Sequence, residues 1–342
     1  MGNPVGGKNL LLSGTPIFFE TEKSRADLEK QLLSGKLMIR ELSVEGRLQD
    51  ARTIRFYLKN QLRRNISGTL ELTVPLKGSR PKHFSVPFAE LRPGIIETVV
   101  LRLDNDIAPT SPPIEGIAKT ATSSGKFSVP VELIVCPYIA ERPKIDGDIS
   151  EWMKHPALTL ETIDFLSPPD AVSHGMWTGN ADLSIKAWLG WDSEYFYFAA
   201  RVSDDIHVRK EGNVFAGDCL QIAFDTRNDA LARGYGRDDF EFGFALGKEN
   251  KPLYSRTWPL PPAVPETILF SARRGNGVTD YEIAIPFKLL KPLGPVEGKV
   301  FGFNFVALDA DLSASTDYWM GYTYGICGGK NPSVFRKFIL GR

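Results

Sequence analysis

The sequence predicts an all-β protein built from two β-sandwich domains. Three observations support this fold class: apolar and polar residues alternate with a period of two, short turn-rich stretches separate the alternating segments, and a length of 342 residues favours two domains. Hydrophobic residues make up 42% of the chain, which is enough for sizeable cores. We therefore expect an N-terminal immunoglobulin-like sandwich over residues 1–137 and a second sandwich over residues 138–342.

The charge balance and the cysteine count exclude several classes of protein. Lys+Arg and Asp+Glu each total 41, which argues against broad attraction to nucleic acid or to an anionic membrane. No apolar run approaches the roughly 20 residues that cross a bilayer, so membrane insertion is not expected. The opening Met1-Gly2 is typical of a trimmed start, which leaves an export signal open. The three cysteines form no CxxC pair and are expected to be small strand or core residues.

The first half of the chain reads as strands separated by turns. Alternation is clear in TIRFYLKN (53–60), GTLELTVP (68–75) and IIETVVLRL (95–103). KFSVPVELIV (126–135) is interpreted as one strand with every second residue, from Phe127 to Val135, on one face. The one helix expected here is SRADLEKQLLSG, where a serine begins the helix and a glycine ends it.

The second half opens with the stretch PKIDGDISEW. Gly147 would permit a turn, and Trp152 is interpreted as an anchor at one end of a sandwich rather than as a ligand platform. LSIKAWLGWDSEYFYFAARVSDD then predicts a hairpin with its turn at Asp192-Ser193. Further strands are predicted in CLQIAFD, DDFEFGFALG, DYEIAIPFKLL and KVFGFNFVALDAD.

The order of these segments resembles a known family. IDGDISEW, KAWLGWDSEYFYFAARVSDD, GDCLQIAFD, YEIAIPFKLL, GKVFGFNFVALDAD and SVFRKFIL follow one another as in carbohydrate-binding module family 9. The resemblance runs from about residue 140 to the end, and that family is a β-sandwich of secreted glycan-degrading proteins. It implies a non-catalytic saccharide-binding module of an exported, extracellular or periplasmic, bacterial protein of polysaccharide degradation. A catalytic domain or a protein partner is expected beside it.

A sugar ring presents apolar C–H faces and a rim of hydroxyls, so its site needs an aromatic plane and rigidly held polar groups. Sugar-binding members of the family clamp a terminal ring between two tryptophans. Here the first tryptophan falls on Phe215 and the second on about Gly329, while an acidic residue falls on Gln221 and an arginine on Gly243. Loop aromatics could rebuild the site or simply pack. The candidate saccharide-binding residues are Phe215, Gln221, Trp177, Trp258, Trp319, Lys330 and Asn331.

Aspartates gather where predicted strands begin or end. Asp204 and Asp205 end one strand, and Asp238 and Asp239 open another. Ca²⁺ takes several oxygen ligands, and modules that resemble this one often carry structural calcium, so both pairs are candidate calcium ligands. The alternative is that these carboxylates are simply solvated.

Two other functions stay open. A structural or protein-interaction sandwich that has lost sugar binding is favoured by the missing second tryptophan and by Gly243. A glycoside-active enzyme is the third, because paired carboxylates hydrolyse glycosides when their spacing is right. The sequence has no GxSxG motif, no P-loop and no strand followed by GxGxxG, so we do not expect an enzyme.

Overall fold

The structure is a computed structural model that describes residues 10–12, 15–17, 41–167, 176–209, 213–311, 316–327 and 329–342. In these ranges strands dominate, and the helices are 3-10 turns of six residues or fewer, which confirms the all-β prediction. The expected helix SRADLEKQLLSG lies outside the described residues. Among the described residues, no helix has the length and apolar character that a membrane span requires.

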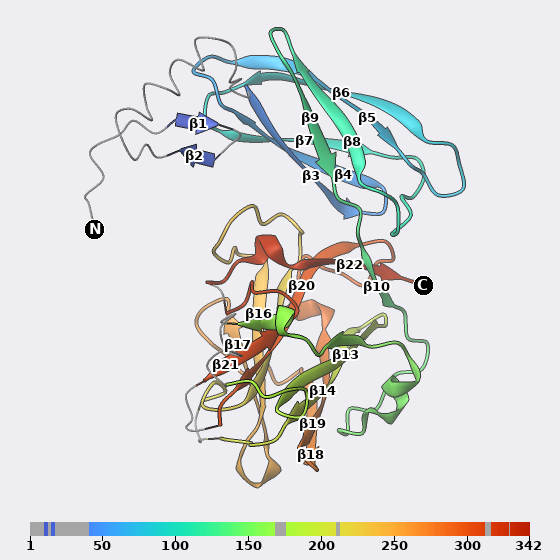
Figure 1. Cartoon of the computed structure of the whole chain (residues 1–342). Coiled ribbons are helices and arrows are strands. Elements are labelled where there is room, and N and C mark those ends of the chain that lie inside the picture. The colour runs from blue at the N-terminus through green and yellow to red at the C-terminus, as the bar shows by residue number, and fades with distance from the viewer. Residues whose placement is uncertain are drawn as a thin grey trace, which may run out of the picture. The chain divides into compact units, whose positions relative to one another are not determined.

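The chain divides into two compact units, shown in blue-green and in green to red in Figure 1. One contains Met1–Leu48 and Arg52–Glu132, and the other contains Gln49–Ala51 and Leu133–Arg342. The second unit therefore begins slightly before the predicted boundary at residues 137 and 138.

The N-terminal unit contains two antiparallel sheets. One has the strand order β3 (Leu42–Asp50), β4 (Thr53–Asn60), β7 (Ile96–Arg102); the other has the order β6 (Lys82–Leu91), β5 (Ile66–Val74), β8 (Ile114–Thr120), β9 (Ser124–Val129). β1 (Leu10–Leu12) and β2 (Thr15–Ile17) form a separate pair. The two main sheets pack face to face, since the rings of Phe56 on β4 and Phe127 on β9 lie 5.8 Å apart. The immunoglobulin-like topology stays a prediction.

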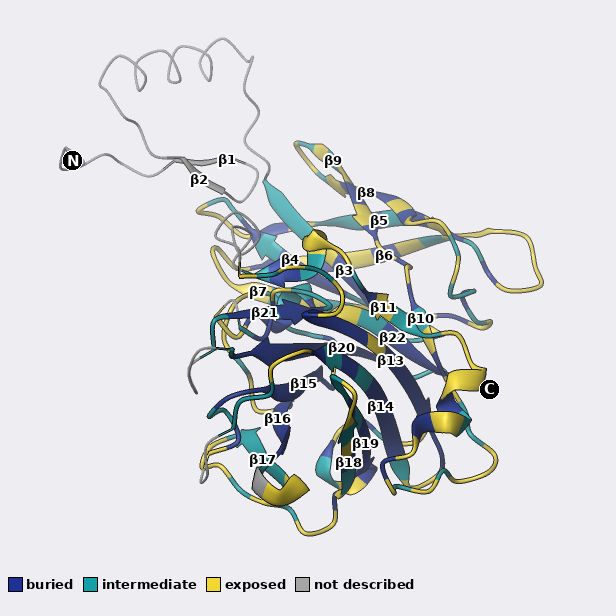
Figure 2. Ribbon diagram, turned by 60° about the horizontal axis from the view of Figure 1, so that its bottom comes forward, coloured by how far each residue is buried: buried dark blue, intermediate teal, exposed yellow. Residues whose placement is uncertain are grey.

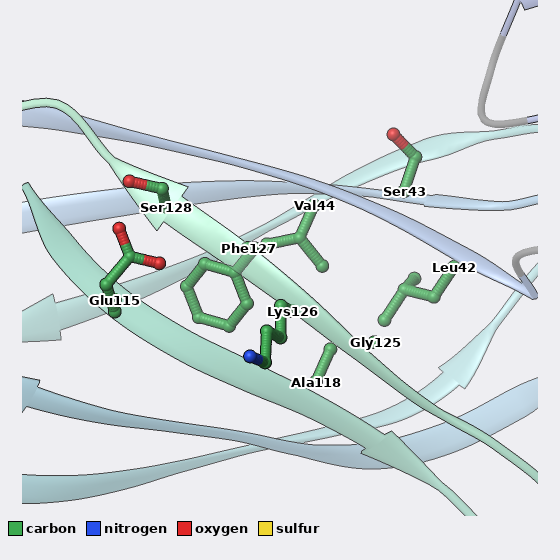
Figure 3. A pocket seen from close by; sticks show the side chains of 9 residues that line it. All are labelled: Leu42, Ser43, Val44, Glu115, Ala118, Gly125, Lys126, Phe127 and Ser128. Carbon is green, nitrogen blue, oxygen red and sulfur yellow. The ribbon is translucent and has the colours of Figure 1, made fainter.

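A groove of about 360 Å³ opens between β3 and the β8–β9 pair of this unit. Figure 3 shows Leu42 and Val44 facing Phe127 and Ala118 across it. β3 and β9 are both edge strands of their sheets among the described residues, so the sandwich is open along this side.

The C-terminal unit pairs an eight-stranded sheet with a five-stranded sheet. The larger sheet has the order β10 (Ile134–Pro137), β22 (Arg336–Gly341), β20 (Val300–Asp309), β15 (Cys219–Asp225), β16 (Asp239–Leu246), β17 (Pro252–Trp258), with β21 (Tyr318–Gly321) beside β20 and β12 (Leu166–Ser167) beside β21. The smaller has the order β11 (Leu158–Leu160), β13 (Leu183–Trp191), β14 (Tyr195–Asp204), β19 (Val278–Pro286), β18 (Leu269–Gly275).

The predicted hairpin is confirmed as β13 and β14, which pair in antiparallel register from Leu183 to Trp191. Its turn forms because Asp192 Oδ1 accepts hydrogen bonds from the backbone N–H groups of Glu194 (2.7 Å) and Tyr195 (2.8 Å).

The prediction of one continuous strand over residues 126–135 is wrong. β9 ends at Val129, Pro130 follows, and β10 begins at Ile134 in the other unit. Proline has no backbone N–H to donate to a ladder, and β10 pairs in parallel with β22, far along the chain. Val135 is consequently 50% exposed rather than buried beside Phe127.

Phenylalanines fill the space between the two sheets, where Phe196 and Phe198 of β14 meet Phe303 and Phe305 of β20. The central strands β13, β14, β15, β16, β19 and β20 are almost entirely buried, as the dark blue ribbons of Figure 2 show. Side chains that point away from this core are therefore covered as well, and each sheet carries a second apolar cluster on its outer side.

On the outer side of the five-stranded sheet, which we call the capped face, the 3-10 helix η1 (Ile149–Lys154) covers the strands. The chain can turn into η1 because Gly147 has φ +85°, where a side chain would be strained. Trp152, 4% exposed, donates its indole N–H to Glu282 Oε1 at 3.0 Å. Its interpretation as an anchor is therefore confirmed. The capped face consists of Ile149, Trp152, Trp188, Tyr197, Ala199 and Ala284.

Candidate functional site

The outer side of the eight-stranded sheet, which we call the aromatic face, carries half-buried rings over a small apolar cluster. Its buried members are Val214, Cys219, Ala223, Ala245, Val306, Leu308, Ile326 and Phe335, and Phe215, Tyr235 and Trp319 pack against them. Trp258 joins through Tyr235, since the two ring centres lie 5.8 Å apart. Four rings from four separate loops or strands thus gather on one surface.

Phe215 is held on this face by its own loop. Gly217 has φ +107°, and a Cβ there would lie 1.8 Å from the carbonyl oxygen of Val208, so only glycine fits. Arg209 closes the loop by donating to the carbonyl oxygens of Asn213 (3.0 Å) and Val214 (3.1 Å). These contacts position residues 213–217, and with them Phe215.

Gly243 explains why Phe215 can lie against the sheet. A Cβ at Gly243 would lie 3.1 Å from Phe215 Cε1 and 3.0 Å from Val214 Cγ1, so a larger side chain would have to displace both. The absence of a side chain at Gly243 thus leaves room for the Phe215 ring to lie on the sheet.

A buried carboxylate ties three parts of the aromatic face together. Glu241, 2% exposed, accepts hydrogen bonds from Tyr235 Oη (2.6 Å), Thr257 Oγ1 (2.9 Å) and Lys330 Nζ (2.6 and 2.8 Å). Burial and the charge of Glu241 raise the pKa of Tyr235 well above its usual range. Lys330 has φ +52°, a conformation that costs a non-glycine residue about 1 kcal/mol, and the ion pair compensates for it.

On the aromatic face, the described residues offer no hydrogen-bond partner to two buried polar atoms, Gln221 Oε1 and Trp319 Nε1. Gln221 is 5% exposed, and its Oε1 is buried without a hydrogen bond, while its Nε2 meets only Cys219 Sγ at 4.0 Å. Trp319 Nε1 is also buried without a partner. Buried polar groups in proteins are nearly always paired, so an unpaired acceptor and an unpaired donor on one face call for an explanation.

The structure places six of the seven candidate saccharide-binding residues on or beside the aromatic face. Phe215, Gln221, Trp258, Trp319 and Lys330 lie there as described. Asn331 lies in the adjoining loop, where its Oδ1 accepts a hydrogen bond from Ser333 Oγ at 2.6 Å. Trp177 does not join them, because it packs against the sandwich core and donates its indole N–H to the carbonyl oxygen of Leu183 at 3.0 Å.

Sequence reasoning missed Tyr235 and Glu241, which organise the face. A signal for Glu241 was present: in the strand DFEFGF it occupies the register that points away from the phenylalanines, so its carboxylate had to lie on the outer side. Tyr235 sits in a glycine-flanked loop, GYG, whose position only the fold reveals.

Among the described residues, acidic side chains form three clusters in which ligand atoms lie within 4.8 Å of one another. The first joins Asp204, His207 and Asp218. His207 Nδ1 lies 3.3 Å from Asp204 Oδ2 and 3.1 Å from Asp218 Oδ2, and Arg274 lies 3.2 Å from Asp204. Burial disfavours the imidazolium, but these carboxylates outweigh it and raise the pKa of His207 to about 9. The carboxylates of this cluster are therefore already paired with two cationic side chains, His207 and Arg274. Asp205 is exposed and outside it.

The other two clusters have only oxygen ligands. Asp182, Asp309 and Asp311 form one, and burial together with the neighbouring carboxylates raises the pKa of Asp309 to about 9 and that of Asp311 to about 6. Within the described part of the chain, the buried atoms Asp309 Oδ2 and Asp311 Oδ1 have no hydrogen-bond partner.

Asp225, Asp238 and Asp239 form the third cluster, where burial followed by nearby carboxylates raises the pKa of Asp239 to about 7. The predicted pair Asp238 and Asp239 is thus completed by Asp225 from the neighbouring strand. Asp182 and Asp311 were not among the predicted ligands, because only the fold joins the residue before β13 to the end of β20.

Comparison with known proteins matches the C-terminal unit to a protein family. The family model "Carbohydrate family 9 binding domain-like" matches residues 165–341, which is more than half of the chain. Two solved structures of a family 9 carbohydrate-binding module from Caldicellulosiruptor kristjanssonii are similar to the chain. The cellotriose complex is 21% identical, with a TM-score of 0.47, and covers 61% of this chain and 94% of its own. The glucose complex is 20% identical, with a TM-score of 0.46, and covers 61% and 96%. No curated protein matches.

Proposed function

The chain belongs to the carbohydrate family 9 binding domain-like family, and from this premise we propose that its C-terminal unit binds a saccharide on the aromatic face. The observation that carries the proposal is the meeting of half-buried rings with an unpaired acceptor and an unpaired donor at one surface. Rings offer apolar planes to the C–H faces of a sugar. A sugar hydroxyl can donate to an acceptor such as Gln221 Oε1 or accept from a donor such as Trp319 Nε1, once the side chains that cover these buried atoms move.

The proposed role is binding without catalysis, in an exported glycan-handling protein. Support comes from the family, which is named for binding, and from the fixed state of Glu241. Its two oxygens already accept four hydrogen bonds, two of them from Lys330, which leaves a carboxylate that holds structure rather than one that moves a proton.

Calcium at the two all-oxygen clusters is a further part of the proposal. Ca²⁺ prefers several carboxylate oxygens, and a divalent cation would balance the charge of carboxyl groups whose pKa is raised first by burial and then by neighbouring carboxylates, as at Asp309 and Asp239. Asp182, Asp309 and Asp311 would hold one ion, and Asp225, Asp238 and Asp239 another. The His207 cluster does not fit, since an imidazolium and an arginine already balance its carboxylates.

The saccharide proposal is tested by replacing one ring on the aromatic face. Phe215→Ala should weaken glycan retention about tenfold, because the loss of one stacking contact costs roughly 1–1.5 kcal/mol. Retention is measured on a glycan array that includes cellotriose and glucose, and then by titration calorimetry with the strongest hit. Trp177→Ala is the matched control, an aromatic residue removed from a loop that packs on the core instead.

If retention survives in Phe215→Ala and is lost in Trp177→Ala, the aromatic face is not the site. The alternative function is a structural or protein-interaction module. It is favoured by Gly329, which has no side chain where the family's second ring stands, and by Phe215, which lies down against Gly243. A folded parent protein that retains no glycan on the array would support this alternative.

A further inference from the structure

A second groove lies on the same unit, on the turn between β13 and β14 and the segment that follows β19. It has a volume of about 680 Å³, which is within the usual range for small-molecule sites. Phe287 and Leu293, 5% and 1% exposed, line it with buried apolar side chains. Its other lining residues are Ser193, Glu194, Tyr195, Pro286, Lys288, Lys291, Pro292, Gly294 and Pro295, none of which belongs to the aromatic face.

The two walls of the groove are joined and braced by hydrogen bonds within the protein. The backbone N–H of Phe287 donates to the carbonyl oxygen of Glu194 at 2.9 Å, which ties its two walls together. On one side Asp192 fixes the turn through the N–H groups of Glu194 and Tyr195. On the other side the prolines have restricted φ angles. A preformed groove spares the ligand the cost of ordering the protein.

The charges at the rim are unbalanced in favour of cations. Arg142 pairs with Asp192 at 2.9 Å and with Glu194 at 3.1 Å, so one guanidinium is shared by two carboxylates, of which only Glu194 lines the groove. The same guanidinium lies 5.0 Å from the centre of the Tyr195 ring. Lys288 and Lys291 are exposed, and neither has an ion-pair partner within the described part of the chain. Two free ammonium groups therefore flank an apolar floor.

We propose that this groove is a second saccharide site, selective for chains that carry carboxylate groups, such as uronates. The sugar rings would lie on the floor formed by Phe287, Leu293 and the prolines, and the carboxylates would pair with Lys288 and Lys291. The choice of a saccharide over an acidic peptide rests on the proposed function. The choice of an acidic ligand rests on the two lysines alone.

The test compares tetragalacturonate with cellotetraose, by titration calorimetry on the full chain. Tetragalacturonate should bind the parent protein, and its affinity should fall on going from 50 to 500 mM NaCl, because salt screens exposed charge pairs. Lys288→Gln with Lys291→Gln should weaken that binding about tenfold, since two exposed pairs contribute roughly 1.4 kcal/mol together. Lys154→Gln with Lys251→Gln is the matched control, with the same charge change at exposed positions outside the groove.

Three results would overturn the inference. They are no binding of tetragalacturonate, equal loss in both lysine pairs, or tetraglutamate binding as tightly as tetragalacturonate. Phe215→Ala separates this groove from the aromatic face: it should weaken neutral glycans and leave tetragalacturonate unchanged. If the parent binds tetragalacturonate and no neutral glycan, the groove stands and the aromatic-face proposal fails.

Discussion

The two outer faces of the C-terminal sandwich are made from the same kinds of residue but end in opposite states. On the capped face, Trp152 donates to Glu282, Trp188 donates to the carbonyl oxygen of His155 at 2.9 Å, and Tyr197 donates to Asp192 at 2.7 Å. On the aromatic face, Gln221 Oε1 and Trp319 Nε1 are left unpaired. The capped face pairs its polar atoms internally, whereas two polar atoms of the aromatic face have no partner among the residues that the structure describes.

The two faces show how a structural tryptophan can be distinguished from a tryptophan that could stack against a ligand. Aromatic content does not distinguish the two faces, since each carries tryptophan and tyrosine. The covering segment and the hydrogen bonds do distinguish the two faces. The 3-10 helix η1 covers the capped face, whereas the rings of the aromatic face stay half-buried. Three experiments test this difference between the two faces.

The largest effect is expected on the capped face. Trp152→Ala should lower the free energy of unfolding by about 3–5 kcal/mol, because it removes a buried ring and one hydrogen-bond donor to Glu282. Glycan retention by the fraction that stays folded should not change. Urea denaturation gives the first quantity and the array gives the second. Trp152→Phe keeps most of the ring and should lose less stability; a selective loss of retention would show that the two faces are coupled.

Calcium removal should loosen mainly the larger sheet, which carries the aromatic face. Five of the six carboxylates of the all-oxygen clusters lie at or next to the ends of β15, β16 and β20, whereas Asp182 precedes β13 of the smaller sheet. At 100 times its Kd, one bound ion stabilises by about 2.7 kcal/mol, so chelation should remove roughly this much per site. Hydrogen exchange should then accelerate in β15, β16 and β20 but not in β14 and β19. Asp309→Asn with Asp311→Asn should abolish part of the calcium effect, and uniform acceleration would contradict the placement.

The smallest effect is expected at Gln221. Gln221→Met removes the unpaired carbonyl while keeping the shape of the side chain, so stability should stay the same or rise by less than about 1 kcal/mol. Saccharide affinity should fall severalfold, because a polar contact to the ligand is lost. Thermal unfolding and calorimetry on the same samples separate the two quantities. A loss of stability with no change in affinity would mean that Gln221 serves the fold alone.

The sequence predicted elements whose signal is local. The β13–β14 hairpin follows from its alternation and its Asp-Ser turn, and the turn at Gly147 before Trp152 follows from the glycine. The prediction from sequence was wrong over residues 126–135, because the end of this segment belongs to β10, which pairs with the distant strand β22. It also could not separate Trp177 from Trp258, because both lie in polar loops and only the surface beneath each ring differs.

By itself, the sequence determined the all-β class and the strands with clear alternation, such as β4, β13 and β14, because a period of two and its turn residues are properties of neighbouring residues. The tertiary structure alone decided which side chains share a face or a cluster. Asp182 meets Asp309, and Lys330 meets Glu241, across long stretches of chain, because sheet pairing rather than sequence distance sets what lies side by side. Sheet pairing also decides which carboxylates have a cationic partner nearby and which have none. That difference separates structural sites from candidate binding sites.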